Sequence, residues 1–176
     1  LGFGATVTTL TLVSIKDRGA SALLTTDDVS YLGVALDDFD GGLVGLEDLL
    51  VFQAYDVDAV INKAAHGDGV TVPAKLDWST FTSTGLDISA AQGLLNTTSL
   101  GNLTASVDVA IDGGVALNVL SGVLVAKGDF TIALGEVKSA LLPSGNLQDA
   151  DAMTLTLTNV GVFVGVGGSL NANGTP

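Results

Sequence analysis

The sequence predicts an all-β fold, elongated and mainly antiparallel, on three observations. Apolar residues alternate with Thr, Ser and Asp in several stretches, most regularly over 153–160. Turn-forming Gly pairs separate such stretches, and helical patterns are few. Alternation with a period of two places successive side chains on opposite faces of a sheet. We expect a β-sandwich or a curved β-sheet repeat module, with a β-solenoid as the alternative.

The predicted strands follow one another along most of the chain. They are expected at 5–16, 30–37, 43–61, 103–111, 115–126, 129–137, 153–160 and 161–167. Their Val, Thr, Ile and Phe residues favour strands, because branched and aromatic side chains pack well on a pleated surface. A short helical turn is expected at 87–95.

Two Asp-Gly-Gly sequences, at 40–42 and 112–114, are predicted to be hairpin turns between these strands. Asp-Gly and Gly-Gly readily adopt the positive φ that tight hairpins need. Long connections are expected at 62–88 and 142–150, where the alternation is lost. We therefore expect residues 1–176 to form a single β-rich module, which could be a slice of a tandem array.

The composition excludes several classes of protein. Nineteen acidic residues face six basic ones, for a net charge of −13, so a nucleic-acid partner is not expected. No Cys is present, which excludes disulfides and thiolate metal sites. No apolar stretch reaches the roughly 20 residues of a membrane-spanning helix, and no signal peptide opens the sequence. Few Lys and many Asp, Thr, Asn and Gly indicate a bacterial extracellular or cell-surface protein.

Two stretches resemble a unit of very large bacterial repeat proteins. The first contains Gly-Asp-Phe at 128–130, and the second contains Asn-Val-Gly-Val-Phe-Val-Gly-Val-Gly at 159–167. The segment 30–60 is similar to the same unit. Those proteins are secreted or surface-displayed, adhesin-like and often associated with calcium. The resemblance implies a structural or adhesive role and brings no catalytic residues with it.

The acidic residues that precede or follow predicted strands are candidate calcium ligands. Ca²⁺ binds six to eight oxygen atoms, which carboxylates and backbone carbonyls supply. Strand alternation predicts that Asp38 and Asp40 share one face, with Asp37 on the other, and that Asp56 and Asp58 share a face. Neither an EF-hand loop nor a Gly-rich calcium nonapeptide is present. Solvated Asp residues at turns are the competing interpretation.

Other candidate sites favour structural interpretations. His66, the single His, lies in a predicted surface loop, and no nucleophile elbow accompanies it. The Thr154, Thr156 and Thr158 ladder has the spacing of an ice-binding row, but an ordinary strand with its polar residues exposed is the favoured interpretation. The aromatic residues are expected to fill the core between two sheet layers. They are Phe39, Phe52, Trp78, Phe81, Phe130 and Phe163.

The sequence thus predicts a structural or adhesive module of an extracellular rod, filament or surface layer, and not an enzyme. Its expected partners are identical or neighbouring modules, joined through sheet edges and module ends. The alternative is a module that binds carbohydrate or a host surface, with glycans as partners, and ice binding is a weaker alternative. Bound Ca²⁺ would stiffen the joints between modules.

Overall fold

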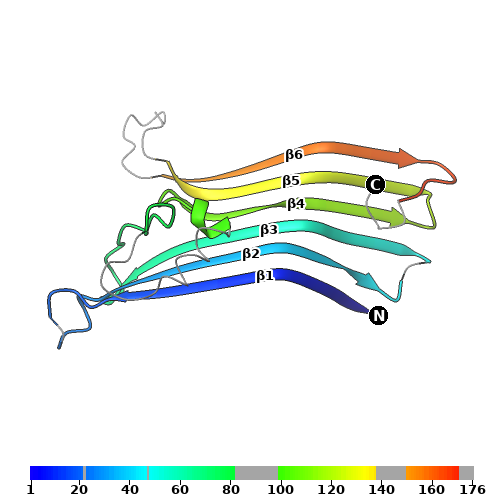
Figure 1. Cartoon of the computed structure of the whole chain (residues 1–176). Coiled ribbons are helices and arrows are strands. Elements are labelled where there is room, and N and C mark those ends of the chain that lie inside the picture. Colours follow the sequence, from blue (N-terminus) through cyan, green and yellow to red (C-terminus); the bar gives the residue numbers. More distant parts are fainter. Residues whose placement is uncertain (22, 47, 82–98, 138–149, 171–176) are drawn as a thin grey trace.

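A computed structural model describes residues 1–21, 23–46, 48–81, 99–137 and 150–170 of the chain (Figure 1). Six strands form one sheet in the order β1-β2-β3-β4-β5-β6, and every neighbouring pair is antiparallel. The elements are β1 (Gly2–Asp17), β2 (Val29–Val44), β3 (Leu50–His66), a 3-10 turn η1 (Ser99–Asn102), β4 (Val107–Val119), β5 (Leu124–Val137) and β6 (Ala150–Val164). The prediction of an all-β, mainly antiparallel fold is confirmed, and the sheet is the curved one.

The Asp-Gly-Gly sequences lie inside strands, so the prediction that they form hairpin turns is wrong. Residues 40–42 belong to β2, and residues 112–114 belong to β4. The chain reverses further along instead, between Val44 and Leu50 and between Val119 and Leu124. Likewise, the two strands predicted at 153–160 and 161–167 are one strand, β6. The strands are therefore longer than the local turn signals indicate.

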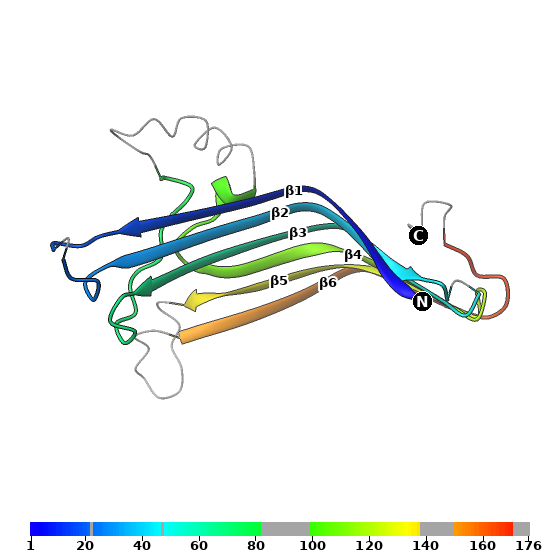
Figure 2. The same ribbon diagram turned by 90° about the horizontal axis from the view of Figure 1, so that it is seen from below.

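All six strands bend near their middle (Figure 2). The bend coincides with register shifts between β2 and β3 and between β5 and β6, close to Asp38, Asp56 and Asn159. These three residues have positive φ angles of 59°, 49° and 53°. Asp and Asn tolerate this backbone conformation better than other residues with a side chain, and an inserted residue makes a β-bulge that turns the strand. Polar residues in mid-strand thus produce the curvature.

The two faces of the sheet differ in what covers them. The connection between β3 and β4, which contains η1, packs on one face of the sheet, near the C-terminal end of β1 (Figure 2). We call this face the covered face. Trp78, Leu100 and Leu103 from this connection are buried against Ala35 of β2. Gly33 lies beneath the indole, where a Cβ atom would come within 2.8 Å of the ring carbons of Trp78. This small core is the main buried apolar contact of the described chain.

The opposite face, here the open face, carries two apolar rows that cross all six strands. One row consists of Leu10, Leu36, Ala59, Ile111, Ile132 and Leu155, and the other of Leu12, Val34, Ile61, Val109, Leu134 and Met153. Each row follows residues that stand directly opposite one another in neighbouring strands, so their side chains project from the same face. All twelve are half-buried or exposed, and none is buried.

The aromatic residues do not form the predicted core between two layers. Of the six, only Trp78 is buried, and Phe81 packs beside it with ring centroids 5.9 Å apart. Phe163 is 44% exposed, and the other Phe residues are half-buried on the sheet. The prediction assumed a second sheet, and the described strands form a single layer.

Candidate functional site

An acidic band crosses the sheet at the bend. It consists of Asp38, Asp40, Asp56, Asp58, Asp112 and Asp129, which β2, β3, β4 and β5 contribute. The strand pairing brings these residues together, because Asp58 stands opposite Asp112 and Tyr55 stands opposite Gly114, whose other neighbour is Asp129. Four separate strands thus concentrate negative charge in one region of the sheet.

The carboxylates of the band bind backbone groups that the bulges remove from the strand ladder. Asp38 donates its backbone N–H to Oδ1 of Asp58 at 2.8 Å, and Asp56 donates its N–H to Oδ1 of Asp40 at 3.1 Å. The exchange is reciprocal, since each of β2 and β3 supplies one amide and one carboxylate. An unpaired backbone N–H is costly, and a charged acceptor makes a strong hydrogen bond. The acidic residues thereby stabilise the bend.

The third bulge has its own polar partner. Asn159 of β6 donates from Nδ2 to Oδ2 of Asp129 at 2.6 Å. Thr8 of β1 extends the same line to the first strand by donating its hydroxyl to Oδ2 of Asp38 at 3.4 Å. Side-chain hydrogen bonds therefore accompany the bend from one edge of the sheet to the other.

Crowding of negative charge affects two titratable groups at the band. Burial raises the pKa of Tyr55, and the charges of Asp129 and Asp56 raise it further. Burial also raises the pKa of Asp112, with a second contribution from Asp58. Both effects mean that further negative charge is unfavourable in this region, so a cation bound to the band would relieve repulsion.

The structure brings four of the five candidate calcium ligands together in pairs. These are Asp38 with Asp58 and Asp40 with Asp56, and Asp37 stands opposite Thr9 on β1. Simple alternation does not describe this part of the chain, because bulges interrupt β2 and β3. Among the described residues, no group of three or more His, Cys, Asp or Glu side chains has an arrangement that could hold a metal ion. Calcium binding stays a prediction.

Asp112, Asp129 and Asn159 also belong to this region, and none of them is among the residues predicted for it. Their signal is present in the sequence, since each is an Asp or Asn next to Gly or within two residues of it inside an apolar stretch. For Asp112, in the Asp-Gly-Gly sequence at 112–114, that pattern predicts a hairpin turn. The strand pairing, which the sequence does not supply, aligns the residues across the sheet.

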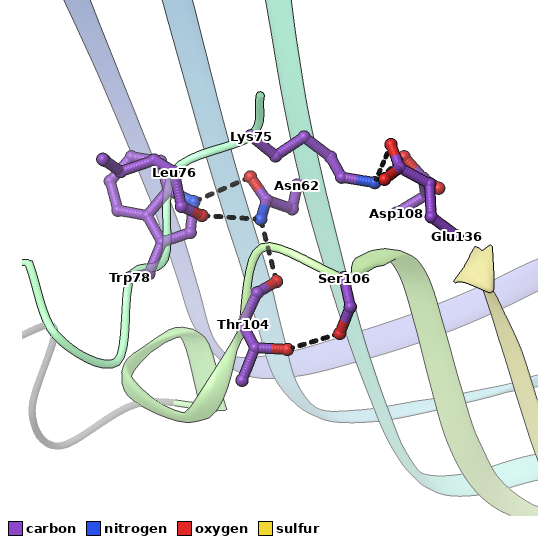
Figure 3. Close-up of polar contacts among 8 residues, drawn as sticks. All are labelled: Asn62, Lys75, Leu76, Trp78, Thr104, Ser106, Asp108 and Glu136. Atoms are coloured by element: carbon purple, nitrogen blue, oxygen red, sulfur yellow. Dashed lines mark hydrogen bonds and ion pairs between the residues drawn. The ribbon is translucent and has the colours of Figure 1, made fainter. Parts of the chain in front are cut away.

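A second polar network fastens the covering connection to the sheet (Figure 3). Asn62 of β3 is fully buried and donates from Nδ2 to the carbonyl oxygens of Leu76 and Thr104, at 2.9 and 3.1 Å. Its Oδ1 accepts a hydrogen bond from Nε1 of Trp78 at 2.9 Å. The amide group of Asn62 thus donates two hydrogen bonds to the connection and accepts one from it. These bonds stabilise the packing of the connection on the sheet, and they indicate a structural role for the network.

Lys75 completes the same network with a largely buried ammonium group. Its side chain is 7% exposed, and Nζ lies 2.9 Å from Oδ1 of Asp108 and 3.4 Å from Oε1 of Glu136 (Figure 3). Two carboxylates around one buried cation compensate its loss of hydration. The ion pairs tie the connection to β4 and β5, while Asn62 ties it to β3.

The other predicted sites are dispersed. His66 ends β3, and its Nδ1 lies 3.1 Å from Oδ1 of Asp68, whose pKa is lowered chiefly by the hydroxyl of Thr71. The Thr154, Thr156 and Thr158 ladder stands opposite Ala133, Thr131 and Asp129, so the regular Thr spacing does not extend to the neighbouring strand. The predicted helical turn at 87–95 lies outside the described residues, as does the predicted connection at 142–150 except for its last residue.

The two edges of the sheet are the remaining candidate surface. β1 and β6 form the margins, and no described strand pairs with their outer sides (Figure 1). Both carry exposed apolar side chains, including Leu12 at 64%, Met153 at 71% and Val162 at 64%. Long apolar edge strands with unpaired N–H and C=O groups are templates for further pairing.

No helix in the described part of the chain has the length and apolar character needed to cross a membrane. Comparison of the chain with protein-family models, with curated proteins and with solved structures finds no match.

Proposed function

We propose that this protein is a structural module of an extracellular assembly, which elongates by pairing β6 of one module with β1 of the next. The observation that carries the proposal is the open sheet with two unpaired edge strands of 16 and 15 residues. The proposal assigns the chain no catalytic role. Identical or tandem neighbouring modules are its partners.

The strand number suits this mode of growth. Six antiparallel strands leave β1 and β6 running in opposite directions. A second module, shifted sideways without rotation, therefore presents its β1 antiparallel to the β6 that it meets. The up-and-down order of strands continues across the junction, and each junction leaves a free β1 and a free β6 at the ends. Such a head-to-tail contact does not close on itself and makes rods or filaments.

The composition of the edge strands supports the same proposal. Natural edge strands usually carry charged side chains, Pro or protective loops that prevent pairing with another sheet. Over 150–164, β6 has one charged residue, Asp151, and no Pro or Lys. Over 2–17, β1 has charged residues only at its end, Lys16 and Asp17. Both edges thus lack the usual protection along most of their length.

Two neighbouring proline variants, Thr156→Pro and Leu157→Pro, test the proposal. Consecutive residues of an edge strand point their N–H groups alternately toward β5 and away from it, and Pro removes this donor. One variant therefore loses an outward N–H, and the other loses a hydrogen bond to β5 and keeps its outward neighbours intact. Circular dichroism and thermal unfolding identify the variant that keeps the sheet intact.

Electron microscopy and light scattering at increasing protein concentration then report assembly. We expect the wild-type chain to form elongated particles and the intact outward variant to stay short. Absence of elongated particles from the wild-type chain at every concentration would refute the proposal. Equal elongation of the outward variant would refute it as well.

A further inference from the structure

We infer that the open face is a second interface, on which another copy of this chain packs face to face. This inference goes beyond edge pairing, because it uses the broad surface of the sheet and a different set of residues. The two apolar rows contain twelve side chains and not one polar group. In the described chain, the segments that pack on the sheet do so on the covered face.

The apolar surface continues past the bend. Phe52, Leu117, Ala126 and Val162 stand opposite one another in β3, β4, β5 and β6. A shallow hollow of about 400 Å³ lies between these four residues and the apolar rows before the bend. Phe52, Leu117 and Ala126 line one side of the hollow, and Leu157 lines the other. Its lining is almost wholly apolar. The open face is therefore continuous along most of the sheet.

The size of the face fits a stable contact between two copies. Six strands about 4.8 Å apart and about 13 residues of about 3.3 Å each span roughly 1,200 Å². The largest apolar patch of an ordinary soluble monomer is about 300–600 Å², and a stable interface buries about 800 Å² of each partner. The half of the face that carries the two complete rows therefore supplies, by itself, most of the roughly 800 Å² that a stable interface buries on each partner.

The single-layer architecture of the described strands points in the same direction. A single-layer sheet leaves both faces in water except where a connection covers one of them. Two copies packed on their open faces would bury apolar surface that neither copy covers alone.

The distribution of charge selects a second copy over a lipid surface. Asp58 and Asp112 lie on the covered face, where they line a hollow with Leu103, and Asp129 shares that face with Asp112, so two chains of net charge −13 can meet on their open faces with these three carboxylates pointing away from the contact. Charged side chains in the alternation of the open face, such as Lys16, Lys63 and Asp151, lie near the strand ends, and the last two lie beside Leu134 and Met153. An apolar centre with a polar rim is the usual anatomy of a protein interface. Surfaces that lie on membranes carry many Lys and Arg residues, and this chain has six in total.

A matched pair of substitutions in β5 tests the inference. Ile132 belongs to the open face, and its neighbour Thr131 is exposed on the covered face. Both lie in an inner strand, so neither touches a sheet edge. At protein concentrations below those at which elongated particles form, sedimentation velocity of the full chain should give a species of twice 17.6 kDa for the wild type and for Thr131→Lys, and a monomer for Ile132→Lys. Face packing closes after two copies, whereas edge pairing gives an open series of larger species, so the two proposals fail separately.

Cysteine labelling tests the same surface if Ile132→Lys does not fold. The chain has no Cys, so Ile132→Cys and Thr131→Cys each create a single thiol for a maleimide dye. At concentrations where the dimer dominates, we expect Ile132→Cys to react about tenfold more slowly, because only the dissociated copy exposes it. Equal labelling rates, or a wild-type chain without the dimer, would overturn the inference. Binding of the monomer to phosphatidylcholine vesicles without dimer formation would overturn it too.

Discussion

Replacing Asn62 with Ala should be among the most damaging single changes in this protein. The amide makes three hydrogen bonds in a fully buried position, to Trp78 and to the backbone of Leu76 and Thr104. Each lost bond costs about 1 kcal/mol, and more where the abandoned partner stays buried. We expect a loss of about 3–5 kcal/mol from a total stability of about 5–15 kcal/mol.

Urea unfolding followed by circular dichroism measures this change, with Lys63→Ala as the control. Lys63 is the next residue of β3, and its side chain is exposed, so its replacement should alter stability by less than about 0.5 kcal/mol. Limited proteolysis gives a second measure, because Asn62→Ala should release the connection that contains Trp78 before the sheet unfolds. A stability loss below about 1 kcal/mol for Asn62→Ala would refute the role of this network.

Three further predictions concern the bend and the core. Asp112→Asn should stabilise the protein at neutral pH, because the raised pKa of Asp112 in the folded state means that its ionised form opposes folding. Urea unfolding measures this gain in stability, which should vanish near pH 3, where Asp112 is protonated in the folded and the unfolded state. A gain that persists at that pH would contradict this explanation. Gly33→Ala should lower the free energy of unfolding by about 1–3 kcal/mol, because the added Cβ would meet Trp78. Gly161→Ala, where the added Cβ has room, should lower it by less, and thermal unfolding of both variants measures the difference. If Ca²⁺ binds the acidic band, millimolar Ca²⁺ should raise the melting temperature and a chelator should reverse the rise, and an unchanged temperature would argue against a structural calcium site.

The presence of strands was predictable because alternation is a local property, but their ends were not: the strands predicted at 43–61 and 115–126 each contain a reversal of the chain. Residues 5–16 and 30–37 were assigned to strands from side-chain order alone, and both lie within β1 and β2. The Asp-Gly-Gly sequences were misassigned because Gly and Asp favour positive φ in a turn and in a bulge alike. The deciding feature is a carboxylate from the next strand: Asp58 accepts the N–H of Asp38 from 20 residues away. The Asp58 carboxylate therefore stabilises a bend within β2, at a place where the local sequence is equally compatible with a hairpin turn.

The sequence by itself determined that this protein is a β-sheet with acidic residues in mid-chain, because composition and alternation act residue by residue. Tertiary structure alone decided that the described strands form one layer, that Asn62 is the buried centre of a polar network, and that twelve apolar side chains align on the face opposite the covering connection. Each of these depends on which strands are neighbours and in what register. Register is a relation between distant residues, and shifting it by one residue would move every side chain of a strand to the other face.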